Sequence, residues 1–352
     1  MKNSSNYLFK KIIGMAFLTI GAQSAAHAVE AGSVEIHGYG NQDYFHASDN
    51  KYLNADRNGT WQNNALALLF ASQIDDKSKV WIQLYGTADK MRLDWAFVDY
   101  QVNNNLTARA GQIKTPIGLY NEIRDIDYIQ MSALKPGIYQ EASEFAHEAF
   151  RGVGMTLNHD LGSGGLSWDA YAGQTVNFDT TSTIKNRQMA GARVTYKTPV
   201  NGLRFMLSAY NDNKQNSATP PQKSAINAWV LSADYNNNDW DIKAEYAKKK
   251  NGLEDKRAKT YYVQTGYTLA DKWTPFVRYD YITTDISQDT DPSYFQKSTS
   301  VGVTYKVNSN IGMRLENHWN KGYALPVAAT DVTAGEGKTD WQMFGASVNF
   351  IF

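Results

Sequence analysis

Hydrophobic and polar residues alternate with a period of two along most of this chain. In LSWDAYAG, for example, Leu166, Trp168 and Ala170 share one side of an extended backbone. Asp169 and Tyr171 share the opposite side. Because successive side chains of a strand point to opposite faces, this alternation predicts strands with one apolar and one polar face. Sixteen segments show it: residues 33–47, 64–71, 79–86, 94–102, 106–111, 149–158, 166–173, 189–197, 203–210, 228–235, 241–247, 258–269, 273–283, 297–307, 311–320 and 339–352.

Short polar turns and longer connectors alternate between these segments. The turns lie at 75–78, 103–105, 160–165, 199–202, 236–238, 270–272 and 308–310. The longer connectors lie at 48–60, 113–147, 177–185, 212–224, 251–256, 284–296 and 321–338, with one short member at 88–91. This order predicts a meander in which each strand pairs with its neighbour in sequence. All turns should then lie at one end of the sheet and all loops at the other.

The number of strands favours a closed sheet over an open one. Twisted open sheets rarely exceed about 10 strands, and they leave two unpaired edges. Closure removes both edges, as a bilayer requires of strands that span it. Sixteen strands enclose a lumen too wide for side chains to fill, so charged faces should line water and apolar faces should meet lipid. We therefore predict an all-β, 16-stranded antiparallel transmembrane barrel with short periplasmic turns and long extracellular loops.

Aromatic residues near the turns fit this orientation. They are Tyr100, Tyr196, Tyr235, Trp240, Trp273, Tyr305 and Phe352. Such rings form belts at the interfaces of membrane barrels. Core packing would explain each ring singly, but their repetition beside the turns favours a belt.

The C-terminal sequence GASVNFIF continues the alternation to the last residue. Ala346, Val348, Phe350 and Phe352 recur at every second position. We expect this strand to pair with the strand near 33–47 and to close the ring, with these side chains facing lipid.

The N-terminus predicts secretion. Lys10 and Lys11 precede the apolar stretch 12–22, which is too short to span a bilayer, and AHA at 26–28 has the form of a cleavage site. Cleavage after Ala28 would make residues 1–28 the signal peptide and residues 29–352 the barrel domain. An uncleaved anchor helix is the alternative.

Composition excludes several functional classes. The 35 basic and 35 acidic residues give no basic excess, which argues against nucleic-acid binding. The chain has no cysteine, which excludes a disulfide framework, a thiolate metal site and a cysteine nucleophile.

The whole mature chain resembles the sixteen-stranded Gram-negative porins. The sharpest local similarity is GQIKTPIGLYNEIRD at 111–125, which looks like a segment of porins related to the phosphate-selective group and of similar porins. The resemblance implies an outer-membrane homotrimer whose third loop folds into the lumen. It also implies that the terminal Phe352 serves as a signal for the barrel-assembly machinery. The Pro-Glu-Phe-Gly-Gly tip usual in the family is absent from the third long connector, 113–147.

The charged residues of this connector and of the facing wall are the candidate pore constriction. Rows of opposite charge across a narrow point sort solutes by charge and size. The connector offers Lys114, Glu122, Arg124, Asp125 and Asp127, together with Lys135, Glu141 and Glu144. The wall offers Arg109, Arg193, Arg204, Arg278 and Arg314. The alternative is that these arginines lie in a wide, screened lumen, and that some loop acids form structural ion pairs with Lys114, Arg124 or Lys135.

Other patterns carry weaker hypotheses. Trp81, Tyr85, Trp95, Phe97 and Tyr171 could form a path for sugars or could pack beneath the loop. The carboxylates of DISQDTDPS at 285–293 could bind calcium, but their spacing fits a solvated surface loop better.

We therefore predict an outer-membrane porin for passive diffusion of small hydrophilic solutes and ions, not an enzyme, without cofactor or metal. It would contact outer-membrane lipid and form a homotrimer through small residues of the strands near 34–40 and 65–71. A surface receptor or adhesin is the alternative, and a barrel hydrolase is a more distant one.

Overall fold

The computed structural model describes residues 34–87, 90–140, 143, 145–176, 185–215, 223–237, 239–252 and 256–352. The signal-peptide prediction and the acids Glu141 and Glu144 lie outside these residues. The sixteen strands are β1 (Val34–Ala47), β2 (Thr60–Gln73), β3 (Ser78–Thr87), β4 (Met91–Gln101), β5 (Leu106–Lys114), β6 (Ala149–Asp160), β7 (Gly165–Thr175), β8 (Lys185–Lys197), β9 (Leu203–Gln215), β10 (Lys223–Asn236), β11 (Trp240–Asn251), β12 (Lys256–Tyr267), β13 (Trp273–Thr283), β14 (Phe295–Lys306), β15 (Ile311–Lys321) and β16 (Asp340–Ile351).

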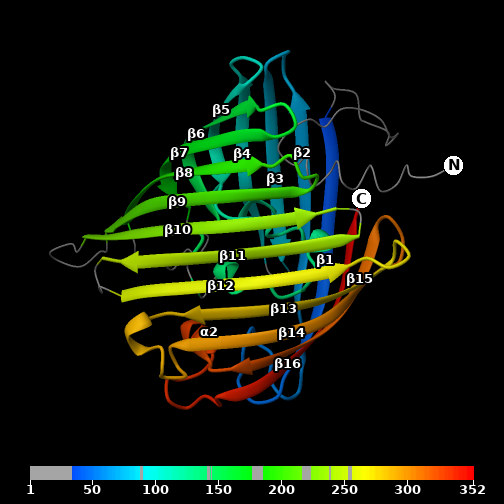
Figure 1. Cartoon of the computed structure of the whole chain (residues 1–352), viewed down its shortest axis with the longest axis vertical. Coiled ribbons are helices and arrows are strands. Elements are labelled where there is room, and N and C mark those ends of the chain that lie inside the picture. Colours follow the sequence, from blue (N-terminus) through cyan, green and yellow to red (C-terminus); the bar gives the residue numbers. More distant parts are fainter. Residues whose placement is uncertain are drawn as a thin grey trace.

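The strands form one closed antiparallel barrel in which each strand pairs with its sequence neighbours and β1 pairs with β16. Strands β9 to β13 cross the front of Figure 1, and β1 to β4 run behind them. The predicted meander and its closure are therefore confirmed. Several strands extend further than predicted: β2 starts at Thr60 because Thr60 and Trp61 continue the register opposite Phe45 and Tyr44.

The junction between β1 and β16 explains the aromatic C-terminus. Gly38 and Phe352 exchange two backbone hydrogen bonds, each 2.9 Å from nitrogen to oxygen. The Phe352 ring lies over Gly38, where an added Cβ would lie 2.1 Å from the ring. A side chain at position 38 would therefore displace the ring that covers the seam.

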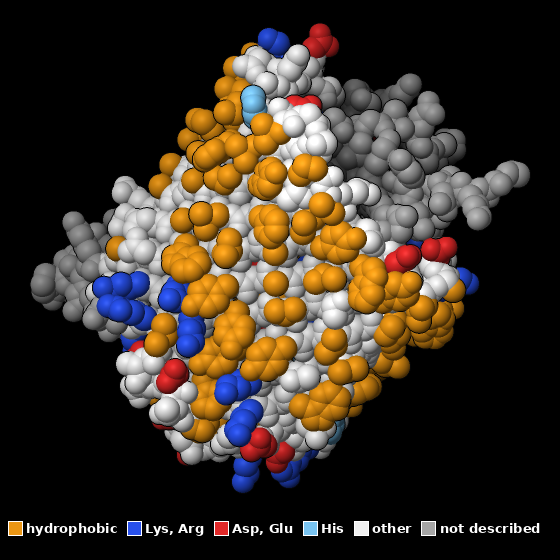
Figure 2. Space-filling view, viewed as in Figure 1, with side chains coloured by type: hydrophobic (Ala, Val, Ile, Leu, Met, Phe, Trp, Pro, Cys, Tyr) orange, Lys and Arg blue, Asp and Glu red, His pale blue; other side chains and the backbone are white. Residues whose placement is uncertain are grey.

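Apolar and polar side chains occupy opposite faces of the barrel wall. Figure 2 shows apolar side chains spread over the middle of the outer wall. The exposed apolar residues of the strands include Val153, Met155, Leu207, Leu231, Val263, Val277, Val301, Leu315 and Val348. Polar residues such as Glu245, Arg278 and Glu316 are buried in the interior instead. This inverted arrangement is the one a bilayer selects.

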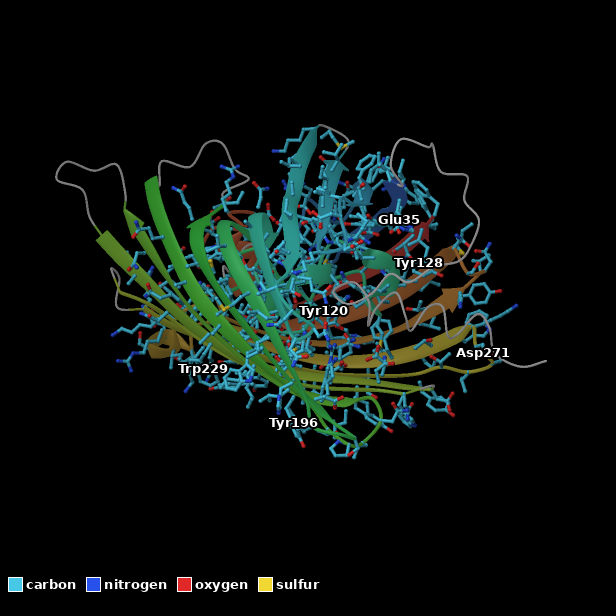
Figure 3. The ribbon with its side chains drawn as sticks, turned by 90° about the horizontal axis from the view of Figure 1, so that it is seen from above. Glu35, Tyr120, Tyr128, Tyr196, Trp229 and Asp271 are labelled. Carbon is cyan, nitrogen blue, oxygen red and sulfur yellow. The ribbon has the colours of Figure 1, made fainter. Side chains whose placement is uncertain are left out.

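Aromatic rings gather at the turn ends of the strands, as predicted. Trp240 packs on Tyr267 with ring centroids 4.9 Å apart, and Trp273 packs on Tyr305 at 4.2 Å. Figure 3 shows Tyr196 projecting outward from the wall.

In the part of the chain that the structure describes, helical structure is limited to short segments. They are the 3-10 helices η1 (Asn121–Ile123), η2 (Asp127–Ile129), η3 (Gly137–Tyr139) and η5 (Ile286–Gln288) and the α-helix α2 (Ala324–Ala328). Among the described residues, no helix is both long enough and apolar enough to cross a membrane.

Candidate functional site

The connector 115–148 between β5 and β6, here called the inner loop, folds into the barrel. Ile117, Ile138, Tyr139 and Phe145 are each at most 1% exposed. They share one cluster with Phe97, Phe150, Tyr171, Tyr210 and Tyr262 of the wall. Figure 3 places Tyr120 in the middle of the ring of strands. This position is consistent with the third loop inside the lumen that the resemblance implies.

Glu245 of β11 is the centre of the first attachment between the loop and the wall. Its Oε1 accepts hydrogen bonds from the Leu119 amide at 2.9 Å and from Ser232 Oγ at 2.6 Å. Its Oε2 accepts from the hydroxyls of Tyr139 at 2.6 Å and Tyr262 at 2.9 Å. Four donors on a buried carboxylate satisfy a charge that would otherwise be costly to bury.

Gly118 permits this attachment. Its φ of +60° lies in the left-handed region, and an added Cβ would lie 2.1 Å from Tyr139 Oη and 2.7 Å from Glu245 Oε1. Its amide also donates to Ser208 Oγ of β9 at 3.1 Å. Only glycine combines this backbone conformation with the space available.

Glu316 of β15 is the centre of the second attachment. It accepts hydrogen bonds from the loop amides of Ala133 at 3.1 Å and Leu134 at 3.3 Å. Arg278 of β13 donates to the Leu134 carbonyl at 2.7 Å and to Asp280 at 2.5 Å. These bonds attach the loop to the wall opposite β8.

Behind Glu316, Ser300 and His318 form a chain that resembles a catalytic triad. Ser300 Oγ lies 2.6 Å from His318 Nδ1, and His318 Nε2 lies 2.9 Å from Glu316 Oε1. All three side chains are buried, and Ser300 is completely inaccessible. Since a nucleophile must reach its substrate, this chain supports the loop rather than hydrolysis.

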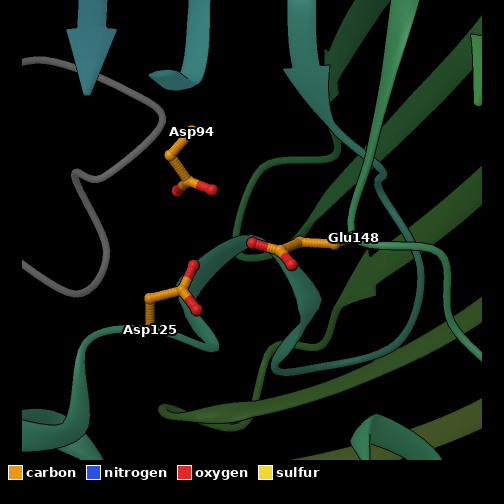
Figure 4. A group of neighbouring side chains, drawn as sticks. All are labelled: Asp94, Asp125 and Glu148. Carbon is orange, nitrogen blue, oxygen red and sulfur yellow. The ribbon is translucent and has the colours of Figure 1, made fainter. Parts of the chain in front are cut away.

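Lys114, at the end of β5, lies among three carboxylates at the base of the loop. Its Nζ is 3.0 Å from Asp94 Oδ2 and also forms ion pairs with Asp125 and Glu148. Figure 4 shows the three carboxylates directed toward a common point. Burial alone would raise the pKa of Glu148, but Lys114, Arg124 and Arg92 together hold that pKa well below its ordinary value. Within the described chain this is the one set of acids close enough together for a metal ion, and the Lys114 ammonium already forms ion pairs with all three.

Glu122 and Arg193 form the clearest charge pair between the loop and the facing wall. Arg193 Nη2 lies 3.3 Å from Glu122 Oε1, Nη1 bonds the other oxygen, and Nε donates to Asp169 of β7 at 2.9 Å. Arg193 and Glu122 are each 12% exposed at the side chain, so both retain access to the lumen.

Arg314 and Asp127 meet on another side of the loop. Arg314 donates to the Asp127 carbonyl, while its Nε and Nη1 have no hydrogen-bond partner among the described residues. Burial raises the pKa of the Asp127 carboxyl to about 7, although Lys135 and Arg314 oppose the shift. The Asp127 carboxyl therefore changes charge near neutral pH.

Some predicted site residues form their described ion pairs within the wall. Arg109 bonds Asp99 at 2.8 and 3.2 Å, and Arg204 bonds Asp234 at 2.7 Å, both with partners on a neighbouring strand. Arg124 lies within the loop and donates to the Tyr139 carbonyl at 2.8 Å. The structure thus pairs Glu122 with Arg193 on one side of the loop and joins Arg314 to Asp127 on another, while Arg278 bonds the loop at Leu134. Lys114, Arg124 and Asp125 instead hold the loop's own fold.

Sequence reasoning did not single out Glu245, Glu316, His318 or Glu148. Glu245 and Glu316 lie on faces that the alternation assigns to the interior, but no local pattern tells which acid will receive loop amides. The rings of Phe97 and Tyr171 belong to the cluster that contains the loop, and Trp81 and Trp95 pack against it. Of the two interpretations of these aromatics, packing with the loop is the one observed. The acids of 285–293 bond locally, as Asp285 accepts from Ser287 and Asp291 from Ser293.

Residues 136–287 match the family model described as Gram-negative porin. No curated protein matches the sequence significantly. Among solved structures, the anion-selective porin from Comamonas acidovorans is similar with a TM-score of 0.64 at 13% identity, covering 91% of this chain and 99% of that chain. The outer-membrane channel DcaP of Acinetobacter baumannii gives 0.61 at 14% identity, covering 94% and 100%. OmpT of Vibrio cholerae, in its trimer form, gives 0.59 at 14% identity, covering 92% of this chain and 100% of that chain.

These comparisons confirm the resemblance to Gram-negative porins. The family model covers the end of the inner loop and strands β6 to β13, and the structural matches extend over the barrel as a whole. The segment 111–125, similar to porins related to the phosphate-selective group, precedes the matched residues.

Proposed function

We propose that this protein is an outer-membrane porin through which small hydrophilic solutes and ions diffuse passively past the inner loop. The observation that carries the proposal is the combination of an apolar outer wall with an interior loop that sets Glu122 against Arg193. Charged side chains that line a narrow passage order water and discriminate between ions. The turn ends would face the periplasm and the loop ends the exterior.

Single-channel recording in planar bilayers tests the pore directly. We expect stable ohmic conductance steps, occurring in threes if the protein assembles as a homotrimer. Purified protein that inserts into the bilayer without conducting would refute the proposal. Hydrolysis of a lipid or peptide by the same preparation would favour the barrel hydrolase instead.

Selectivity variants test the constriction. Arg193 stands between Glu122 and Asp169, so Arg193→Gln leaves two carboxylates without their cation. We expect the reversal potential in a salt gradient to shift toward cation preference. Arg109→Gln should shift it less, because Arg109 is paired with Asp99 and lies outside the described loop contacts. Lys272→Gln, in the turn after β12, is the matched control, since charges more than about 8 Å from the passage are screened.

We also propose a homotrimer formed through β1 and β2. The trimer form of Vibrio cholerae OmpT supports this assembly, as do the exposed Ile36 and Leu66 on the outer face of these strands. Because the chain has no cysteine, any disulfide formed by a single-cysteine variant must join two copies of the chain at the introduced position. Ile36→Cys should cross-link between copies, whereas Val263→Cys on β12 should not. Equal cross-linking of both would place the interface elsewhere.

A further inference from the structure

A small cavity lies between the inner loop and the wall formed by β13, β14 and β15. It is lined by Arg278 and Asp280 of β13, Ser298 of β14, Asn320 of β15 and Lys135 of the inner loop. Its volume is about 30 Å³. Because Ser298 is near the start of β14 and Asn320 is near the end of β15, the cavity lies toward the loop ends of the barrel. This cavity is here called the alcove.

Side chains from three separate segments cover the alcove. They are Tyr52 of the connector between β1 and β2, Leu325 of α2 and Trp341 of β16, each at most 6% exposed. Figure 1 shows α2 beside β14. Tyr52 and Trp341 pack edge to face with ring centroids 6.3 Å apart, and the Tyr52 hydroxyl donates to Gln140 Oε1 of the inner loop at 3.2 Å. The cover is therefore fixed to the inner loop, and the alcove is a preformed cavity, as small-molecule sites usually are.

The acceptor groups of the alcove are already engaged by the protein. Asp280 Oδ2 accepts from Arg278 Nε at 2.5 Å, and Asp280 Oδ1 accepts from the Gly137 amide at 3.3 Å. Asn320 Oδ1 accepts from a side-chain amide of β14 at 3.4 Å. His318, which also lines the cavity, is bonded through both ring nitrogens. A ligand in the alcove would therefore meet donors rather than acceptors.

Several donor groups of the alcove have no hydrogen-bond partner among the described residues. Arg278 uses Nε and Nη1 for the bonds given above, which leaves Nη2. Within the same part of the chain, Ser298 Oγ and Asn320 Nδ2 donate no hydrogen bond, and the two residues are 8% and 7% exposed. Lys135 Nζ lies 3.9 Å from Asp125 Oδ1, and that carboxylate is also paired at the base of the loop. The alcove thus presents donors that lack acceptors.

The charge and the size of the alcove point to one chemical group. Two cations, Lys135 and Arg278, line it together with a single carboxylate, Asp280. An anion would restore the balance of charge and would accept charge-assisted hydrogen bonds. A buried water needs about 10 to 15 Å³, so a cavity of about 30 Å³ accepts two oxygen-sized groups. The two oxygens of a carboxylate fit that space, whereas the four oxygens of a phosphate exceed it.

We propose that the alcove binds the carboxylate group of a small organic acid that enters from the loop ends. Lys135 and Arg278 supply the positive charge, and Asn320 and Ser298 supply neutral hydrogen bonds. The Lys135 side chain is 25% exposed, so water and solutes reach the alcove from that side. The inference rests on the proposed porin function and deepens it, because it names organic acids as solutes that the entrance of the pore collects.

Ligand-observed NMR on the detergent-solubilised protein tests the site. The probes are propionate, its neutral isostere propionamide, and inorganic phosphate. Asn320→Asp keeps the shape of the side chain and adds a negative charge, whereas Lys135→Gln removes a positive charge and Lys135→Arg retains it. The control Lys51→Gln removes a charge from the connector between β1 and β2, at an exposed position that does not line the alcove.

We expect the parent to bind propionate roughly tenfold more tightly than propionamide, because only the carboxylate balances the charge of the alcove. Asn320→Asp and Lys135→Gln should each weaken propionate binding by roughly fivefold or more, whereas Lys135→Arg and Lys51→Gln should bind it as the parent does. Equal binding of propionate and propionamide, equal weakening in Lys51→Gln, or unchanged binding in Lys135→Gln would overturn the proposal. Phosphate that displaces propionate from the parent would overturn the assignment to carboxylates.

Conductance in planar bilayers separates failure of this proposal from failure of the proposed function. A protein that conducts but does not bind propionate remains a porin and has no carboxylate site in the alcove. A protein that binds propionate but does not conduct keeps the site and is not a porin. Lys135 is partly exposed, so Lys135→Gln still tests the proposal if Asn320→Asp does not fold.

Discussion

Tyr139→Phe tests how strongly the inner loop is held to the wall. The phenol hydroxyl donates to Glu245 Oε2 at 2.6 Å and accepts from the amides of Leu119 at 2.7 Å and Tyr120 at 3.2 Å. Phenylalanine keeps the ring and its packing, so the change removes these bonds without leaving a cavity. The substitution therefore isolates the polar part of the attachment.

The contacts give the size of the effect. A hydrogen bond to a charged group contributes about 1.5 to 3 kcal/mol, and a buried amide left without a partner costs about 1 to 3 kcal/mol. The Leu119 amide keeps its second acceptor, Glu245 Oε1 at 2.9 Å, so the orphaned group is the Tyr120 amide. We expect local opening of the loop to become easier by about 2 to 4 kcal/mol.

Hydrogen exchange followed by mass spectrometry measures this opening. Exchange of the amides at 117–121 should accelerate by roughly 30- to 700-fold, because every 1.4 kcal/mol is a factor of ten. Exchange in the strands should be unchanged, since their ladders do not depend on the hydroxyl. Channel recordings should show more frequent current fluctuations.

Tyr120→Phe is the matched control in the same loop. The Tyr120 hydroxyl accepts one hydrogen bond, from Gln264 at 3.2 Å, so its loss should cost about 0.5 to 1.5 kcal/mol. If Tyr139→Phe accelerates exchange no more than Tyr120→Phe, the Glu245 attachment does not hold the loop and our reasoning is wrong.

Three further predictions follow from the loop's surroundings. Gly118→Ala should open the loop at least as much as Tyr139→Phe, because the φ of +60° disfavours alanine and the added methyl would displace the Tyr139 hydroxyl. Hydrogen exchange measures this opening, and an unchanged exchange rate would contradict the prediction. Burial raises the pKa of Asp127 to about 7, so the folded protein keeps a proton that the unfolded chain releases near pH 4. The contribution of Asp127 to the free energy of unfolding should therefore fall as pH rises from about 4 to 7. Ionisation should also increase cation preference as pH rises through about 7, and reversal potentials of Asp127→Asn should lose that step. Lys114→Met should destabilise the barrel by about 3 to 5 kcal/mol in urea unfolding, because three carboxylates lose their cation. A smaller loss of unfolding free energy in this variant than in Lys272→Gln would show that the carboxylates are not charged in the folded protein.

The barrel was predictable because its strands obey one local rule. Alternation with period two identified all sixteen strands, and the alternation of turns and loops fixed their order. The strand ends were less predictable. Residues such as Thr60 and Trp61 of β2 are paired because the neighbouring strand continues beside them, and that register does not appear in the local sequence.

The site was predictable only in part. The resemblance to porins implied that the third long connector, 113–147, would enter the lumen, and the pair of Glu122 with Arg193 joins two of the expected residues. The attachments at Glu245 and Glu316 were not predicted, because they join residues more than 100 positions apart in sequence. Interior alternation shows that such an acid points inward, but the fold of the loop decides which of them receives a donor.

The inner loop also affects the shape of the barrel that surrounds it. A ring of strands joined only to their neighbours can flatten with a small change at each junction. Here the loop is bonded to β8 through Arg193 and to β15 through Glu316, on walls seven strands apart. It therefore fixes a diameter of the ring, so compression from the surrounding bilayer would have to strain this cross-link before it could change the width of the passage.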